Sequence, residues 1–235
     1  NEMGAIEDIP VIARLVKEKN PRTYFHTDAI QAYGKLTLRP KESGIDMLTV
    51  SGHKIHGPKG SGFMYINEKV HINPIIMGGG QQKDRRSGTE NVPGIAGLGL
   101  AAEMYRHEHS QINSRMLSVK DRLIDRLSAM DGVTVNSERG ELSAPHIVNA
   151  SFEGVRAEVL LHALEEKGVY VSSGSACSSN HPAISGTLKA IGIKKELLDS
   201  TLRFSFGIYN EPDEADYAAD CIEELLPVLR RFRRY

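Results

Sequence analysis

Apolar residues recur at helix and strand spacings along most of the 235-residue chain, and they predict alternating helices and strands. Apolar positions about three and four residues apart predict a first helix, which Asn20 and Pro21 end. Short apolar runs bounded by turn residues predict three strands after it. The elements predicted for this half are a helix over 6–19, strands over 23–27, 45–51 and 62–66, and a short helix over 29–33.

The second half begins with a long helical pattern that Asn91 and Pro93 open and Gly132 closes. The remaining predicted elements are a helix over 92–130, strands over 133–136, 147–152, 169–172 and 202–207, and helices over 156–167, 183–191 and 212–231. This order predicts an α/β fold with a mainly parallel sheet. We expect a first domain over 1–105 and a smaller α/β domain over 106–235.

Composition narrows the class of protein. The net charge is −1, with 40% hydrophobic and 25% charged residues, which is ordinary for a globular protein and indicates no nucleic-acid partner. No apolar run is long enough to span a bilayer, so we expect no membrane partner. Two cysteines far apart in the sequence, Cys177 and Cys221, favour a reducing compartment, the cytoplasm.

The segment Ser51-Gly52-His53-Lys54-Ile55-His56-Gly57-Pro58 follows the predicted strand over 45–51. A lysine at the end of a buried strand, between two histidines and beside glycines, is suited to chemistry. Its amine could form a Schiff base with a carbonyl cofactor. The alternative is a solvated lysine in a turn, which the flanking histidines and glycines make less attractive.

Three further residues carry candidate chemistry, each with a structural alternative. Asp28 ends a strand and could pair with a protonated ring nitrogen, while Gln31 could hydrogen-bond a ring hydroxyl. From spacing alone, a helix-capping role for Asp28 is slightly favoured. Arg203 begins an otherwise apolar strand and could bind a substrate carboxylate, and a structural ion pair is equally compatible with its position.

Cys177 lies in a loop of small and hydroxyl residues, where a thiol can stay accessible as a nucleophile. The alternative is a buried apolar role, which the helical context of Cys221 predicts for that second cysteine. The pattern Gly57-Pro58-Lys59-Gly60-Ser61-Gly62 does not match a P-loop and predicts a tight strand connection. We expect no protein-held metal ion, because no Cys-x-x-Cys or matching histidine spacing is present.

Six segments taken together resemble cysteine desulfurases of the NifS/IscS type, in the class V aminotransferase family of pyridoxal-phosphate (PLP) enzymes. They occur in the family's order and span nearly the whole chain. They are Asn1-Glu2-Met3-Gly4, residues 26–31, Ser51-Gly52-His53-Lys54 with residues 57–60, residues 78–80 with 86–89, residues 172–177, and residues 203–207. The resemblance implies a fold-type I transferase: the C-terminal part of a large PLP-binding domain and the small C-terminal domain.

The resemblance also implies roles for single residues. Lys54 would hold PLP as a Schiff base and move substrate protons, with His53 and Cys177 as the other catalytic residues. The implied cofactor-binding residues are Asn1, Asp28, Gln31, Ser51, His53, Lys54 and Thr89, of which Thr89 reaches the phosphate of a second subunit. Asn1 and Arg203 would bind the carboxylate of L-cysteine.

By the same resemblance, Cys177 would take the sulfur as a persulfide, release L-alanine, and pass the sulfur to an iron–sulfur scaffold or another acceptor protein. Cys177 would then lie near a transferred cluster. The family has a long portion before the Asn-Glu-x-Gly motif, so we expect a companion chain that carries this portion, within a homodimer. The alternatives are another family member, such as a selenocysteine lyase or an aminotransferase, and a non-catalytic docking module.

Overall fold

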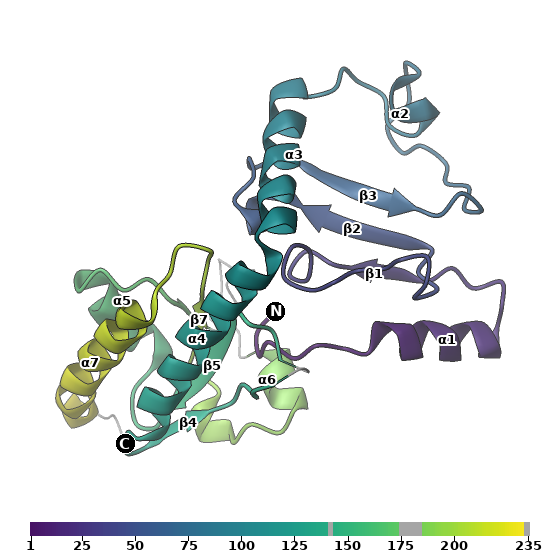
Figure 1. Ribbon diagram of the computed structural model, residues 1–235. Coiled ribbons are helices and arrows are strands. Elements are labelled where there is room, and N and C mark those ends of the chain that lie inside the picture. The colour runs from purple at the N-terminus through teal and green to yellow at the C-terminus, as the bar shows by residue number, and fades with distance from the viewer. Residues whose placement is uncertain (141–142, 174–184, 233–235) are drawn as a thin grey trace. The chain divides into compact units, whose positions relative to one another are not determined.

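The computed structural model describes residues 1–140, 143–173 and 185–232 (Figure 1). The chain divides into two compact units, each described by itself below: a first unit of Glu7–Ser110 and a second unit of Asn1–Ile6 with Gln111–Tyr235. The sequence placed residues 1–6 in the first domain and the boundary after residue 105. The structure instead groups Asn1–Ile6 with the second unit, because this segment forms hydrogen bonds to that unit.

The sheet of the first unit has the order β1-β2-β3 (Figure 1). Strand β1 (His26–Asp28) runs parallel to β2 (Met47–Ser51), and β3 (Gly62–Ile66) runs antiparallel to β2. The predicted sheet was mainly parallel, and β3 is its antiparallel strand among the described residues. The connection from β2 to β3 contains only the short 3₁₀ helix η1 (Gly52–Ile55) and a turn, which reverses the chain where a parallel strand would need a longer crossover.

The helices of this unit agree with the prediction only in part. Helix α1 (Ile9–Lys19) is capped at its N-terminus by Asp8, whose side chain accepts a hydrogen bond from Val11 N. The helix ends before Asn20, as expected. Residues 30–35 form turns in place of the predicted helix, because Gly34 takes a left-handed conformation with φ 80° that a helix cannot continue through. Helix α2 spans Gln81–Asp84.

The predicted helix over 92–130 is two helices, α3 (Val92–His107) and α4 (His109–Ser128). The break lies at Glu108, whose backbone angles of φ −107° and ψ 16° leave the helical region. Asn91 caps α3 by accepting a hydrogen bond from Gly94 N at 3.1 Å, as its place in the sequence predicted.

The second unit has a fully antiparallel sheet in the order β4-β5-β7-β6. Its strands are β4 (Val133–Val135), β5 (Ile147–Phe152), β6 (Ser172–Ser173) and β7 (Thr201–Ser205). Its helices, besides α4, are α5 (Ala157–Glu166), α6 (Gly186–Ala190) and α7 (Pro212–Leu229), with 3₁₀ helices η2 (Lys195–Leu197) and η3 (Arg230–Phe232).

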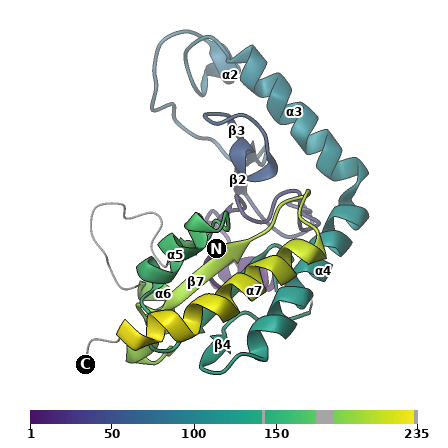
Figure 2. The same ribbon diagram turned by 90° about the vertical axis from the view of Figure 1, so that its left-hand side faces the viewer.

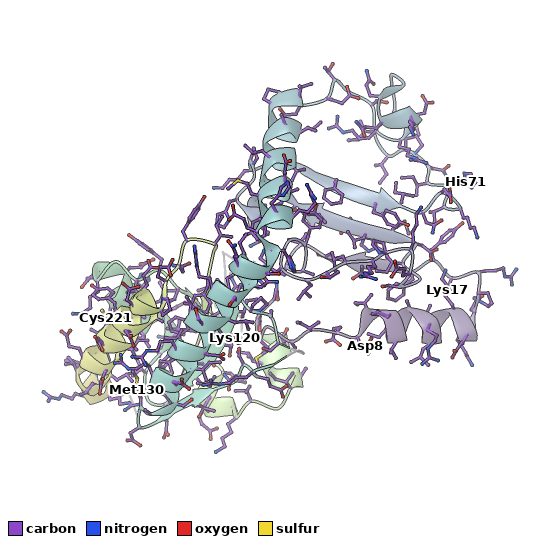
Figure 3. The ribbon with its side chains drawn as sticks, in the orientation of Figure 1. Asp8, Lys17, His71, Lys120, Met130 and Cys221 are labelled. Atoms are coloured by element: carbon purple, nitrogen blue, oxygen red, sulfur yellow. The ribbon has the colours of Figure 1, made fainter. Side chains whose placement is uncertain are left out.

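The apolar faces of α4, α5 and α7 bury a continuous core against β5 and β7. Figure 2 shows the ribbons of α4, α5, α7 and β7 that contribute to it. Leu127, Phe152, Leu160 and Ile222 are fully buried there, and burial of such side chains is the main stabilising term for the unit. Cys221 belongs to this core, which confirms the apolar role predicted for it (Figure 3). Among the described residues, every helix is too short or too polar to cross a bilayer.

Candidate functional site

The lysine-bearing segment lies at one edge of the first unit's sheet. Strands β1 and β2 are parallel, with Asp28 paired to Thr49, so the carboxyl ends of both strands meet at this edge. Asp28 ends β1, Ser51 ends β2, and His53 and Lys54 follow within η1. Functional residues of parallel sheets gather at such an edge. The structure therefore brings together four of the predicted cofactor-binding residues.

Close packing fixes the turn that carries Lys54. Gly52 is buried, its N–H donates to Ser61 O at 2.9 Å, and its carbonyl accepts from Gly57 N at 2.9 Å. A Cβ atom at position 52 would lie 2.6 Å from Ser61 Oγ, so only glycine fits there. His56 ends the turn in the left-handed region, with φ 62°. The predicted tight connection is confirmed, and it presents Lys54 from a rigid support.

The chemical groups at this edge are accessible. His53 and Asp28 are exposed, and Ser51 and Lys54 are half-buried. Asp28 Oδ1 accepts a hydrogen bond from Ile30 N at 2.8 Å, which is the local turn-capping role that spacing favoured. This role also orients the exposed carboxylate. Asp28 can therefore cap the turn and bind a ligand at the same time.

The remaining cofactor candidates of this unit lie on turns and loops. Gln31 is half-buried, three residues after Asp28 in the turn that follows β1. Thr89 is exposed on the loop between α2 and α3. Its implied contact is with a second subunit, and that contact stays a prediction.

A buried lysine lies directly beneath the turn. Lys35 is only 4% exposed, and its Nζ donates to the carbonyl oxygen of Lys54 at 2.7 Å. Burial, together with the nearby charge of Lys54, lowers the pKa of Lys35 from 10.5 to about 8. The charged form of Lys35 is therefore less stable in the folded protein than in the unfolded chain.

We expect this pKa to appear as a pH-dependent stability. Between pH 8 and 10.5 the unfolded chain holds a proton on Lys35 that the folded chain has lost, so stability rises with pH. Relative to Lys35→Met, the free energy of unfolding of the wild-type chain should rise by about 1.2 kcal/mol for each pH unit around pH 9. Denaturant unfolding at several pH values measures this difference. Lys69→Met, at an exposed lysine, should run parallel to wild type, and a flat difference for Lys35→Met would refute the assignment.

In the second unit, the segment Asn1–Ile6 is held by hydrogen bonds along its length. Ser137 Oγ donates to Met3 O at 2.6 Å, and Ala144 N donates to Gly4 O at 2.6 Å. Ser185 Oγ donates to the Glu2 carboxylate at 2.5 Å. These bonds fix the backbone of the Asn-Glu-x-Gly motif on this unit.

Arg203 lies on β7 beside this motif. Its Nη1 donates to Asn1 O at 2.9 Å and its Nη2 donates to Ser172 Oγ at 3.4 Å. In the described part of the chain Arg203 forms no ion pair, and its buried Nε has no hydrogen-bond partner. Both acceptors are neutral, so neither offsets the positive charge of the guanidinium, which is suited to an anionic ligand. The structure thus brings Asn1 and Arg203 together, as the predicted carboxylate site requires.

Two other predictions concern Cys177 and metal ions. Cys177, the predicted nucleophile, lies outside the described residues. Within the described ranges, no group of three or more His, Cys, Asp or Glu side chains is arranged to hold a metal ion.

Sequence reasoning missed the buried lysines. Lys35 contacts the Lys54 turn. Lys120 of α4, labelled in Figure 3, is 1% exposed and donates to Ala144 O at 2.9 Å, and Ala144 N in turn donates to Gly4 O. Lysine is usually solvated, so neither position carries a sequence signal for burial. The sequence feature that comes closest to indicating a structural role for Lys35 is its position directly after Gly34 and shortly after Asp28.

The class V aminotransferase family matches residues 1–217. The chain is 40% identical to the cysteine desulfurase IscS of Methanosarcina thermophila over 230 residues, covering 98% of this chain and 56% of the relative. It is 42% identical to the putative cysteine desulfurase IscS 1 of Bacillus subtilis, covering 96% of this chain and 59% of the relative. A solved NifS-like protein superposes with a TM-score of 0.88 at 35% identity, covering 97% of this chain and 59% of that protein. The chain thus spans less than three fifths of the length of these relatives.

Proposed function

The chain belongs to the class V aminotransferase family, and we propose that it supplies the lysine-bearing part of a PLP-dependent cysteine desulfurase. Family membership confirms the predicted α/β fold class of fold-type I transferases, since the solved NifS-like relative has the same fold. The observation that carries the proposal is the group of Asp28, Ser51, His53 and Lys54 at one sheet edge. The names of the similar proteins support desulfurization of cysteine as the reaction.

The residues at this edge fit PLP by their chemistry. Lys54 offers an accessible amine for the aldehyde, and the exposed Asp28 carboxylate suits a protonated ring nitrogen. Ser51 and His53 would bind the phosphate, while Gln31 and Asn1 would bind the ring oxygen. When bound, PLP supplies an electron sink for the substrate's α-carbon. The Lys54 amine would take up and return the substrate protons, with His53 beside it.

The substrate would be held by the second unit. The Arg203 guanidinium, already oriented by Asn1 O and Ser172 Oγ, would bind the carboxylate of L-cysteine together with Asn1. The Cys177 thiolate would attack the substrate sulfur and form a sulfur–sulfur bond as the carbon–sulfur bond breaks. The bonding pair returns to carbon, which takes up a proton and leaves as L-alanine. The persulfide on Cys177 balances the reaction without an external oxidant or reductant.

Exposed apolar side chains on the first unit support the proposal that a further polypeptide covers this surface in the functional protein. Ile75 is 96% exposed and Met77 81% exposed, and Val92 and Leu100 of α3 are also exposed. A helix that is apolar on all sides is normally buried, and large exposed apolar areas mark interfaces. We propose that these residues contact the portion of the family that this chain does not span. The chain together with that portion is called the assembled protein below.

The remaining parts of the proposal concern partners. The assembled protein would be a cytoplasmic homodimer in which Thr89 reaches the cofactor phosphate of the partner subunit. Sulfur would pass from Cys177 to an iron–sulfur scaffold or another acceptor protein. Any cluster near Cys177 would be cargo and not a resident metal.

The proposal is tested by supplying PLP and L-cysteine to the assembled protein. We expect a yellow protein that forms L-alanine and gains the mass of one sulfur atom on the Cys177 peptide. A protein that forms L-alanine without sulfur on Cys177 would favour another enzyme of the family. A protein that never binds PLP would favour a docking module.

Arg203 should control substrate affinity. We expect Arg203→Lys in the assembled protein to raise the KM for L-cysteine by roughly 10- to 100-fold, because a lysine cannot form the bidentate hydrogen bonds of an arginine with the substrate carboxylate. The kcat should change less. Steady-state kinetics measure both constants, and Arg14→Lys, at an exposed arginine of α1, is the matched control. An unchanged KM would remove Arg203 from the carboxylate site.

A further inference from the structure

Lys35 joins two parts of the first unit that are distant in sequence. It lies after β1, yet its amine donates to the backbone carbonyl of Lys54, 19 residues further along the chain, at 2.7 Å. Lys35 itself is only 4% exposed and the bond is partly buried, so it contributes more than a fully exposed bond of the same length. A buried amine therefore holds the peptide group of the residue that bears the candidate cofactor lysine.

The groups around Lys35 restrict its position. Its Nζ lies 5.7 Å from the centroid of the Tyr105 ring, a cation–π distance. The Tyr105 hydroxyl lies 3.3 Å from His56 Nδ1, and these two rings stack with centroids 6.3 Å apart. Gly34 has φ +80°, and a Cβ there would lie 2.8 Å from Tyr105 Cδ1. Tyr105 and Gly34 thus keep the lysine beneath the turn.

Lys35 adds a support at the Lys54 carbonyl that the bonds of Gly52, Gly57 and Ser61 do not supply. Helix η1 has four residues, and the carbonyls at the end of a short helix lack partners within it. Lys35 supplies a charged donor to one of them, at the residue whose side chain must point toward a ligand. The titratable groups that face Lys35 are Lys54, His56 and Tyr105.

We propose that Lys35 is a positioning residue: its buried amine fixes the carbonyl of Lys54 and thereby the direction in which the Lys54 side chain leaves the turn. This inference rests on the proposed function, in which Lys54 holds the cofactor. Lys35 itself touches neither cofactor nor substrate in this scheme.

The carbonyl bond can be observed without any cofactor. Lys54-Ile55 is the sole Lys-Ile pair in the sequence, so lysine labelled with ¹³C at the carbonyl and ¹⁵N-isoleucine give one correlated NMR signal for the Lys54 carbonyl. In the wild-type chain we expect this carbonyl shift to titrate with a midpoint near pH 8, following Lys35. Lys69→Met should keep the inflection, and Lys35→Met should lose it. A wild-type shift without an inflection, or the same inflection in Lys35→Met, would overturn the inference.

A second readout links the bond to the site. We expect borohydride trapping of PLP on Lys54 in the assembled protein to slow at least about tenfold in Lys35→Met, with Lys69→Met unchanged. Equal trapping in Lys35→Met and wild type would contradict the positioning role. If wild-type Lys54 is not tagged at all, the proposed function fails, while the carbonyl titration still reports the bond by itself. The wild-type titration also needs no variant to fold.

Discussion

Lys54→Ala should abolish turnover in the assembled protein, lowering the kcat for L-alanine formation by roughly 10³-fold or more. The expected effect is large because one amine carries two tasks: it holds the cofactor covalently, and it moves the substrate protons. Removal of the side chain removes both, while the turn itself is held by Gly52, Ser61 and Gly57. The Lys54 variant should therefore stay folded. Steady-state assay of L-alanine, with circular dichroism as the check on folding, measures the result.

Lys59→Ala is the matched control, because Lys59 is an exposed lysine in the same connection between β2 and β3. Its variant should keep near-wild-type activity. Residual activity in Lys54→Ala within tenfold of wild type would exclude Lys54 as the cofactor-bearing residue. Equal losses in both variants would indicate a general effect of removing positive charge from this edge.

The second large effect is expected at Cys177. Cys177→Ser in the assembled protein should bind PLP with a wild-type spectrum and form no persulfide, because a hydroxyl is not a sulfur nucleophile at neutral pH. L-alanine formation should fall to background at the same time. Absorbance spectra and mass spectrometry of the intact protein after treatment with L-cysteine separate the two properties.

The other cysteine of the chain provides the control. Cys221 is buried in the core of the second unit, so Cys221→Ala should lower stability slightly and leave the persulfide on Cys177 in place. Persulfide formation that survives in Cys177→Ser but is lost in Cys221→Ala would reverse the roles given to the two thiols.

The sequence predicted strands better than it predicted their direction. The apolar run over 62–66 coincides with β3, and the polar residues Asp28 and Ser51 were expected at strand ends, where they lie. The antiparallel direction of β3 depends on the tight turn after β2, which hydrogen bonds between Gly52, Ser61 and Gly57 create. The glycines over 57–62 predicted a tight connection, but these bonds join residues with no shared periodicity, so the direction of the strand after the turn was not read from the pattern.

The helices show the same limit. The helical pattern continues from Val92 to Ser128, and only the backbone angles of Glu108 reveal two helices. The segment Asn1–Ile6 contains a family motif, but nothing in its sequence indicates which unit it packs against. Its place in the second unit depends on hydrogen bonds from Ser137, Ala144 and Ser185.

Burial of polar groups was the least predictable property of the site. The sequence identified Lys54 because glycines and histidines flank it, whereas Lys35 has no such context. Its burial follows from packing against Tyr105, whose position in α3 is far from Lys35 in sequence. Lys54, a candidate ligand-binding residue, has neighbours in the sequence that mark it, whereas Lys35, which holds the Lys54 carbonyl, has none.

Peptide mapping after borohydride reduction of the assembled protein with PLP shows directly whether Lys54 holds the cofactor. We expect the reduced cofactor on the peptide that contains Lys54. Cofactor bound at a different lysine, with residue 54 unmodified, would contradict this expectation.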